Sequence, residues 1–200
     1  MFYETASNDH GLPHNPFKAI VSPRPIGWIS SLDADGRTNL APYSFFNAVS
    51  DRPPIVVFSS SGFKDSAANA EATGEFVCNM ASWDLKDEMN VSSAMVSNET
   101  CEFELSGLEM ASSRLVKAPR VARAVTALEC KRLQTLRLKD LDGADTDNWL
   151  VFGQVIGIHI DDSIIVNGKV DVTRFKPLSR LGYMEYAAIT EVFEMARPKV

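Results

Sequence analysis

The chain has 200 residues, of which 45% are hydrophobic and 23% are charged, a composition typical of one soluble globular domain. Its formal net charge of −6 disfavours a nucleic-acid-binding surface, because such surfaces carry a clustered excess of Lys and Arg. No apolar run reaches the ~20 residues of a membrane-spanning helix, and the start, MFYETASNDHG, lacks the basic and apolar blocks of a signal peptide. We therefore expect a cytoplasmic protein with no nucleic-acid or membrane partner.

The first half of the chain alternates strand patterns with two helix patterns. The strand patterns cover residues 24–33, 38–48, 53–60 and 75–81. Asp35-Gly36 is a hairpin-turn signal between the first two of them. Residues 64–74 are rich in alanine and end at Gly74, which predicts a helix with a glycine stop. Residues 83–95 predict a second helix, with Asp84 as its cap.

The second half is predicted to be mostly β, with long strands over 124–138 and 148–160. In the later strand Gly153 and Gly157 share one face, where missing side chains allow a sharp bend, as at a barrel corner. The other face carries Leu150, Phe152, Ile156, Ile158 and Ile160. Several long strands, few helices and no βαβ rhythm predict a closed antiparallel β-barrel with helical insertions.

Neither the cysteines nor the histidines form a recognisable site. Cys78, Cys101 and Cys130 are scattered and odd in number, so they predict buried free thiols. His159 lies in a strand pattern with no evident acidic or cysteine partner, which predicts neither a catalytic triad nor a zinc site. The stretch DLDGADTDN at 140–148 resembles a calcium loop but lacks glutamate at its twelfth position, so we expect a turn there.

The segment FSSSGFKDS is the strongest chemical lead. A predicted strand ends at Phe58, hydroxyl side chains and a glycine follow, and a helix begins near Lys64. Free N–H groups at a helix N-terminus, hydroxyls and a lysine together suit a phosphate group. A strand, a turn and an ordinary capped helix account for the same residues. The residues alone leave both interpretations open.

Two earlier segments allow a ligand-binding and a structural interpretation in the same way. In PRPIGWISS the prolines stiffen the chain around Arg24, and alternation places Trp28 and Ser30 on one face. That strand is either one wall of a pocket for a flat ligand or an edge strand with a core tryptophan. NLAPYSFFNAVS, at 39–50, is either a bulged strand that packs on two surfaces or an aromatic ligand floor or subunit interface.

Taken together and in this order, the three segments resemble the flavin reductase-like family of FMN-binding split-barrel proteins. The resemblance covers most of residues 17–81 and is reinforced by SRLGYMEY at 179–186. It implies a mainly β fold, an antiparallel Greek-key split β-barrel with a few peripheral helices. It also implies a single FMN-binding domain over residues 1–200, with 1–15 as an extension or arm, and a homodimer that holds FMN near its interface.

The resemblance also implies which residues hold the cofactor. Trp28 and Ser30 would border the flavin, and Arg24 would contact the flavin or a partner subunit. The isoalloxazine ring would be lined by Tyr43, Ser44, Phe45, Phe46 and Asn47. The phosphate would be held by Ser59, Ser60, Ser61, Lys64 and Ser66, and the site would be closed by Arg180, Gly182 and Tyr186.

The activity implied is that of an NAD(P)H-dependent flavin reductase, in which a nicotinamide, NADH or NADPH, gives a hydride to flavin N5. The cofactor carries this chemistry, so no catalytic side chain and no metal are expected. A flavin-dependent monooxygenase or another acceptor would then receive the electrons. The alternative is a non-catalytic FMN carrier, similar to a flavoredoxin, that a partner protein reduces.

Overall fold

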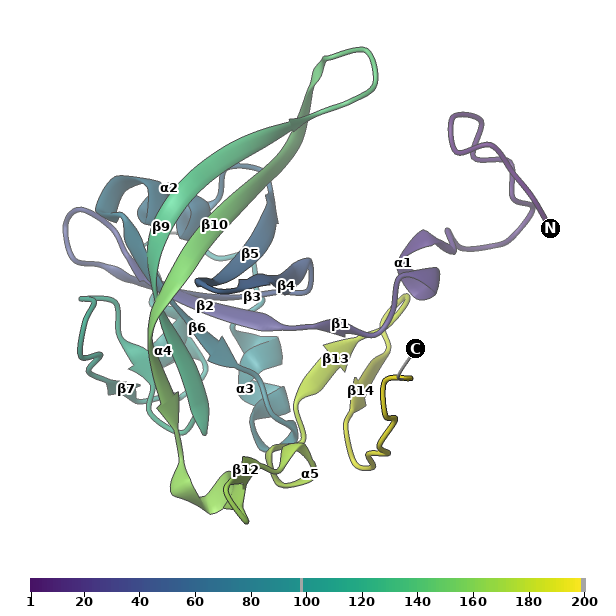
Figure 1. Cartoon of the computed structure of the whole chain (residues 1–200). Helices are drawn as coiled ribbons and strands as arrows, with labels where there is room; N and C mark the ends of the chain where they lie inside the picture. Colours follow the sequence, from purple (N-terminus) through teal and green to yellow (C-terminus); the bar gives the residue numbers. More distant parts are fainter. Residues whose placement is uncertain (98, 199–200) are drawn as a thin grey trace.

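The computed structural model describes residues 1–97 and 99–198, and its central feature is a seven-stranded antiparallel sheet with the order β3-β2-β6-β9-β10-β5-β4 (Figure 1). The strands are β2 (Gly27–Leu32), β3 (Thr38–Tyr43), β4 (Phe46–Asp51), β5 (Pro54–Ser61), β6 (Glu75–Met80), β9 (Thr126–Lys139) and β10 (Asp145–Ile160). Three hairpins, β2–β3, β4–β5 and β9–β10, account for most of the sheet, and β6 joins β2 to β9.

The sheet curls on itself because β3 and β4 lie at its opposite edges although only Ser44 and Phe45 separate them in the sequence. Neighbouring strands lie ~4.8 Å apart, so the edges of a flat sheet of this width would be too far apart for so short a connection. The Ser59 N–H donates to the Phe45 carbonyl at 2.8 Å and ties the connection to β5. The mainly β, antiparallel split barrel predicted from the sequence is confirmed.

The strand β2 is buried on both faces and separates two hydrophobic clusters. Ile29 points into the barrel, where it joins Phe58 and Phe76, and all three side chains are fully buried. Trp28 points the other way and packs against Phe103 on the outside. That outer cluster is covered by η1 (Trp83–Leu85), α3 (Lys86–Val91) and α4 (Glu102–Leu105). The barrel therefore has an interior core and a second core under these helices.

The helix α2 (Asp65–Thr73) closes one side of the interior core. Ala67 and Ala70 are fully buried against the barrel, because their small side chains allow close approach of the helix. Gly74 has φ 74° and ends the helix in the left-handed region, as the sequence predicts.

The long strand β10 bends at its glycines, as predicted. Its register with β9 shifts next to Gly153 and next to Gly157. A Cβ on Gly153 would lie 2.4 Å from Cζ of Phe76, so the Phe76 ring packs directly against the backbone of Gly153. The buried face carries Val151, Gly153 and Val155, whereas the isoleucines Ile158 and Ile160 are exposed on the other face.

Two predicted elements differ from the structure. The extended stretch expected over 38–48 is two strands, because the chain leaves one edge of the sheet at Ser44 and enters the other edge after Phe45. The helix expected over 83–95 ends at Val91, and Asp84 lies inside the 3-10 turn before it and does not cap α3. Residues 140–144 form the turn at the tip of the β9–β10 hairpin, as predicted, whereas residues 145–148 already belong to β10.

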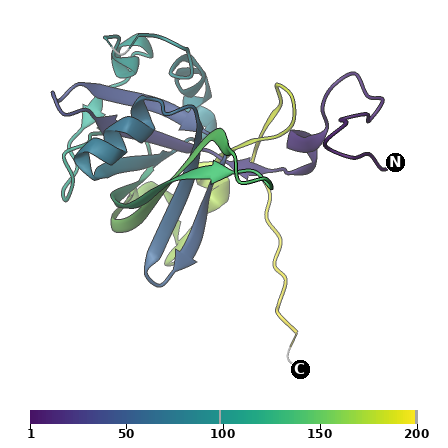
Figure 2. The same cartoon turned by 90° about the horizontal axis from the view of Figure 1, so that it is seen from above.

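A smaller sheet lies beside the barrel. It has the order β1-β13-β14, with β1 (Arg24–Pro25), β13 (Leu178–Arg180) and β14 (Tyr186–Ala188). The remaining elements are α1 (Phe17–Ile20), α5 (Val172–Phe175), η2 (Asp162–Ile164) and the two-stranded pairs β7 (Met110–Ala111) with β8 (Arg120–Val121) and β11 (Ile165–Val166) with β12 (Lys169–Val170). The N-terminal segment before α1 and the C-terminal segment after β14 extend away from the barrel (Figure 2). Among the described residues no helix is long and apolar enough to cross a membrane.

Candidate functional site

Three cavities follow the bend between β3 and β4. The Lys64 cavity, about 330 Å³, has a lining that includes Asn39, Tyr43, Lys64, Asp65, Ser66 and Glu102. The arginine cavity, about 280 Å³, has a lining that includes Lys18, Arg24, Ser44, Arg180, Tyr183 and Tyr186. The aromatic groove, about 710 Å³, has a lining that includes Phe17, Ile20, Phe45, Phe46, Asn47 and Ser59.

The three cavities share lining residues and form one trough. Pro42 and Ser93 line both the Lys64 cavity and the arginine cavity. Arg24 and Ser44 line both the arginine cavity and the aromatic groove. The trough therefore runs along the two-residue connection that closes the barrel, with a cationic side chain in each part.

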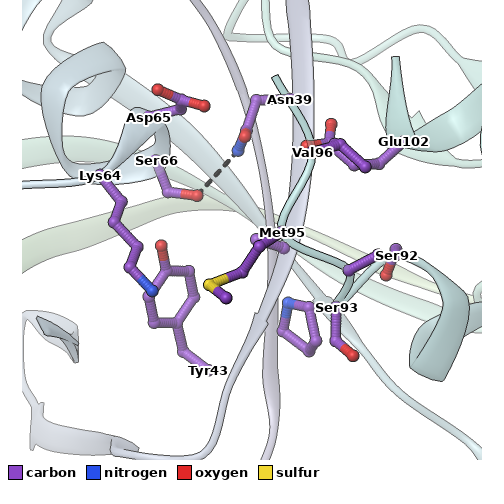
Figure 3. A pocket seen from close by; sticks show the side chains of 13 residues that line it. Asn39, Tyr43, Lys64, Asp65, Ser66, Ser92, Ser93, Met95, Val96 and Glu102 are labelled. Atoms are coloured by element: carbon purple, nitrogen blue, oxygen red, sulfur yellow. Dashed lines mark hydrogen bonds between the residues drawn. The ribbon is translucent and has the colours of Figure 1, made fainter. Parts of the chain in front are cut away.

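The Lys64 cavity is built where β5 ends and α2 begins. Gly62 turns the chain with φ +83°, and Lys64 stands in an extended conformation at the N-cap position. The first N–H groups of a helix have no carbonyl partner within it and carry partial positive charge. Figure 3 shows the Lys64 amine, the Tyr43 ring and the Met95 thioether pointing into the same space. A cationic group and a helix N-terminus therefore meet at one cavity.

Polar neutral groups form one wall of the Lys64 cavity. The buried Ser66 hydroxyl accepts a hydrogen bond from the Asn39 side-chain amide at 2.8 Å (Figure 3). Burial raises the pKa of the Tyr43 phenol, and hydrogen bonds with Ser66 and Ser60 partly oppose that rise. This wall presents hydroxyl groups without adding negative charge.

Two carboxyl groups, Asp65 and Glu102, also line the Lys64 cavity. A Glu102 oxygen accepts the Leu40 N–H at 3.1 Å. Burial raises the pKa of Glu102, and the nearby Asp65 charge acts in the same direction. Burial and the neighbouring carboxylate therefore both disfavour the charged form of Glu102.

The arginine cavity contains two guanidinium groups on neighbouring strands. Arg24 and Arg180 are direct cross-strand partners in the β1–β13 pair. Arg24 donates to the carbonyls of Lys18 and Val21, and to the Leu181 carbonyl at 2.7 Å. Its Nε is buried and has no hydrogen-bond partner. Burial and the neighbouring Arg180 charge lower the pKa of Arg24, so this pair of like charges is held together by the fold.

The two neighbouring phenylalanines that line the aromatic groove differ in exposure. Phe45 is 44% exposed, and the Arg24 guanidinium lies 5.6 Å from its ring centroid. Phe46 is buried, and a Cβ on Gly27 would lie 2.5 Å from its ring. Asn47 is exposed at the groove and Ser59 is partly buried there.

Most of the residues singled out in the sequence lie along this trough. Those that line it are Arg24, Tyr43, Ser44, Phe45, Phe46, Asn47, Ser59, Lys64, Ser66, Arg180 and Tyr186. The others, Trp28, Ser30, Ser60, Ser61 and Gly182, are not among its lining residues.

The residues outside the trough have other contacts. Trp28 is fully buried, and its indole N–H donates to the Ser92 hydroxyl at 2.9 Å. Ser30 is fully buried and donates to the Pro119 carbonyl at 2.5 Å. Both therefore belong to the core of this structure, which differs from the ligand-bordering role expected from the sequence. Ser60 donates to the Gly62 carbonyl inside the turn, and Ser61 is exposed.

Gly182 allows the close approach of two segments. A Cβ there would lie 2.4 Å from the Cβ of Ala19, so the glycine lets the β13–β14 turn pack against α1. Gly182 lies beside the arginine cavity and contacts α1, the helix that contains Lys18.

Residues 21–174 match the family model for the flavin reductase like domain. The chain belongs to the flavin reductase-like family. An uncharacterized protein of Aquifex aeolicus is 36% identical over 173 residues, which cover 84% of this chain and 85% of the relative. The uncharacterized protein YwrF of Bacillus subtilis is 31% identical and covers 89% of both chains.

Solved structures share the fold of this flavin reductase-like protein. Nitrilotriacetate monooxygenase component B from Bacillus cereus aligns with a TM-score of 0.88 and 27% identity over 98% of both chains. The 2-nitrobenzoate 2-nitroreductase of Pseudomonas fluorescens aligns with a TM-score of 0.85 and 26% identity over 99% of this chain and 96% of its own. Flavoredoxin of Desulfovibrio vulgaris, at 18% identity, shares the fold with a TM-score of 0.77 over 88% of this chain and 92% of its own.

The family match covers the bend, the Lys64 cavity and most of the aromatic groove. It ends at residue 174, before β13, so Arg180 and Tyr186 lie outside the matched residues. In this flavin reductase-like protein, sequence reasoning did not identify Asn39, Glu102 and Lys18 as parts of the site. Asn39 begins the stretch NLAPYSFFNAVS but has no role assigned within it, and Lys18 and Glu102 stand in no motif, so only the folded chain brings them to the cavities.

Another buried charged group of this flavin reductase-like protein is Glu129 on β9. The carboxylate of Glu129 accepts the N–H groups of Arg114 at 2.8 Å, Leu115 at 2.6 Å and Val116 at 3.1 Å. Nε2 of His159 lies 2.5 Å from Oε1 of Glu129, so the histidine has the acidic partner that the sequence did not reveal. Burial opposes ionisation of Glu129, but these hydrogen bonds hold its pKa below the usual range. The pair fastens residues 114–116 to the barrel.

We expect Glu129→Gln to lower the free energy of unfolding by about 2–4 kcal/mol, because a buried anionic acceptor is lost. Since the folded pKa of Glu129 is depressed, its contribution is complete above the ordinary glutamate pKa of ~4.3 and is lost as pH falls through the folded value. Urea unfolding between neutral pH and acid checks both points. Glu104→Gln, at an exposed position, is the control, and equal losses in the two variants would contradict the prediction.

Proposed function

We propose that this protein is an FMN-binding oxidoreductase, a flavin reductase that takes a hydride from NADH or NADPH. The observation that carries the proposal is that the residues matched to the flavin reductase like domain include the bend and the Lys64 cavity. Two neighbours above 25% identity support an oxidoreductase, because one is named a nitroreductase and the other a component of a monooxygenase.

The Lys64 cavity has the chemistry that the phosphate of FMN needs. The Lys64 amine supplies a charge, the start of α2 supplies N–H groups, and Ser66 supplies a hydroxyl. We therefore assign the phosphate to Lys64 and Ser66, with Ser59, Ser60 and Ser61 forming the turn that positions them.

The bend itself suits a flat ring. Residues 43–47 lie between the Lys64 cavity and the aromatic groove, and Phe45 presents an exposed aromatic face there. FMN supplies the electron chemistry when it is bound. The protein residues hold its phosphate, orient its ring against the bend and limit water beside it. No proton transfer by a side chain is needed for this role.

We propose a homodimer with FMN near its interface. Phe17, Ile20 and Phe45 are exposed apolar side chains around the aromatic groove, and a second copy would cover them. Sedimentation equilibrium of the FMN-loaded protein should give twice the chain mass. Phe17→Ser with Ile20→Ser should shift the mass toward one chain, whereas Met184→Ser, also exposed but outside the groove, should not. A single-chain mass for the unmodified protein would refute the dimer.

We expect Lys64→Ala to weaken FMN binding about tenfold or more, because a charged hydrogen-bond donor to the phosphate is removed. Quenching of FMN fluorescence on titration with protein measures the dissociation constant. Lys169→Ala is the matched control, because it removes the same charge from an exposed side chain that does not line the cavity. Unchanged FMN affinity in Lys64→Ala would show that the phosphate lies elsewhere.

We expect NADH or NADPH to bleach the flavin absorption band of the FMN-loaded protein in stopped-flow mixing. Steady-state assays with FMN, FAD and riboflavin as acceptors then show whether reduced flavin leaves the protein. A flavin band that neither nucleotide bleaches would favour the carrier, a flavoprotein reduced by a partner protein. A chain that does not bind FMN at all would contradict both functions.

A further inference from the structure

The arginine cavity has an unbalanced positive charge. Lys18, Arg24 and Arg180 line it, and no carboxylate is among its lining residues. Across residues 1–97 and 99–198, no ion pair is formed by any of these three cations. The chain as a whole carries a net charge of −6, so neutralising carboxylates are plentiful elsewhere and missing here.

The placement of the two arginines costs folding free energy. Like charges directly opposite each other on antiparallel strands are destabilising, and Arg24 and Arg180 are such a pair. Arg24 is 7% exposed, and its pKa is lowered by burial and by the Arg180 charge. Its three carbonyl contacts hold α1 and the β13–β14 turn, but its buried Nε remains without an acceptor. A buried guanidinium held opposite a second arginine, in a cavity with no lining carboxylate, points to an anion as the ligand of this cavity.

The rest of the cavity wall suits an anionic group with an organic body. The Arg180 guanidinium is held in place 4.3 Å above the Tyr186 ring and donates to the Tyr183 carbonyl at 2.5 Å. Ser44 and Ser93 add hydroxyl groups. A fixed guanidinium beside hydroxyls matches the oxygens of a carboxylate or a phosphate.

The cavity is adjacent to the proposed flavin site without being part of the phosphate site. It shares Pro42 and Ser93 with the Lys64 cavity and Ser44 with the aromatic groove. FMN has one phosphate, and Lys64 with the start of α2 already provides for it. The positive charge of the arginine cavity is therefore available to bind a different molecule, one that reacts with the flavin.

We propose that the arginine cavity binds the oxyanion of the second substrate, the molecule that gives electrons to the flavin or takes them from it. Lys18 and Arg180 are the specificity-determining residues, and Arg24 positions the wall between them. This inference rests on the proposed function. The oxyanion belongs either to the phosphates of a nicotinamide dinucleotide or to the carboxylate of an acidic acceptor, which share the chemistry that the cavity recognises.

The test uses the FMN-loaded protein and two small anions, inorganic pyrophosphate and benzoate, titrated by calorimetry. We expect at least one anion to bind, and Arg180→Gln and Lys18→Gln each to weaken it about tenfold, since a hydrogen bond to a charged group is lost. Arg52→Gln is the matched control, because it removes the same charge from a side chain that is 93% exposed. Thermal unfolding of each variant checks folding, and Arg180→Gln should not lower Tm because it relieves the repulsion of Arg24.

Kinetics distinguish the two sources of the oxyanion. If the dinucleotide phosphates bind here, Arg180→Gln raises KM for NADH about tenfold and leaves the rate with uncharged N-benzyl dihydronicotinamide unchanged. If an acceptor carboxylate binds here, the variant raises KM for 2-nitrobenzoate and not for nitrobenzene. Arg180→Lys should restore part of either loss, because the charge returns without the planar guanidinium.

Three results would overturn the inference. The first is that neither anion binds. The second is that Arg180→Gln, Lys18→Gln and Arg52→Gln bind the anion equally. The third is that Arg180→Gln loses FMN affinity tenfold. The last result would assign the arginine to the flavin itself. Failure of the unmodified protein to bind FMN is a separate outcome, which would contradict the proposed function before the anion is tested.

Discussion

The short connection through Ser44 and Phe45 is the constraint on which the rest of the structure depends. It joins strands at opposite edges of the seven-stranded sheet, so the sheet must close around its core. The same closure exposes the ring of Phe45, buries that of Phe46 and leaves the backbone of the bend at the surface between three cavities. Connections between strands are a common place for a binding site, because a rigid scaffold positions them while their backbone stays at the surface.

Positively charged side chains gather around this junction, although the chain as a whole is negatively charged. The chain has six more acidic than basic residues, yet Lys64, Lys18, Arg24 and Arg180 gather along one trough. In the Lys64 cavity the carboxyl groups of Asp65 and Glu102 line the same space as the cation. In the arginine cavity no carboxylate is among the lining residues. The two cavities therefore differ in how strongly they should attract an anion, although they lie side by side.

Two buried carboxylates away from the trough have N–H or cationic partners. Glu129 has three N–H donors and a histidine, and Glu75 pairs with the Lys131 amine at 2.6 Å. Both carboxylates fasten irregular segments to strands and so serve stability. Arg24 differs from both, because its guanidinium lines a cavity that holds a second arginine and has no carboxylate among its lining residues.

Local patterns in the sequence determined much of the fold. Alanines and Gly74 specify α2, because they favour a helix and its left-handed end, and the glycines of β10 specify where that strand bends. The motif FSSSGFKDS likewise indicated the Lys64 cavity, since a strand end, a turn and a helix start are local features. Their combination with PRPIGWISS and the aromatic bend was enough to indicate the family to which the chain belongs.

Only the tertiary structure decided which strand faces were buried and which distant residues met. Alternation indicated that Trp28 and Ser30 share one face of the strand, but it did not indicate what covers that face. In the structure the helices α3 and α4 cover it, so the face is part of the core. The break at Ser44 was invisible in the sequence because β3 and β4 each have ordinary strand composition. Glu102, Lys18 and the partner of His159 come from segments without motifs, and long-range packing alone brings them into place.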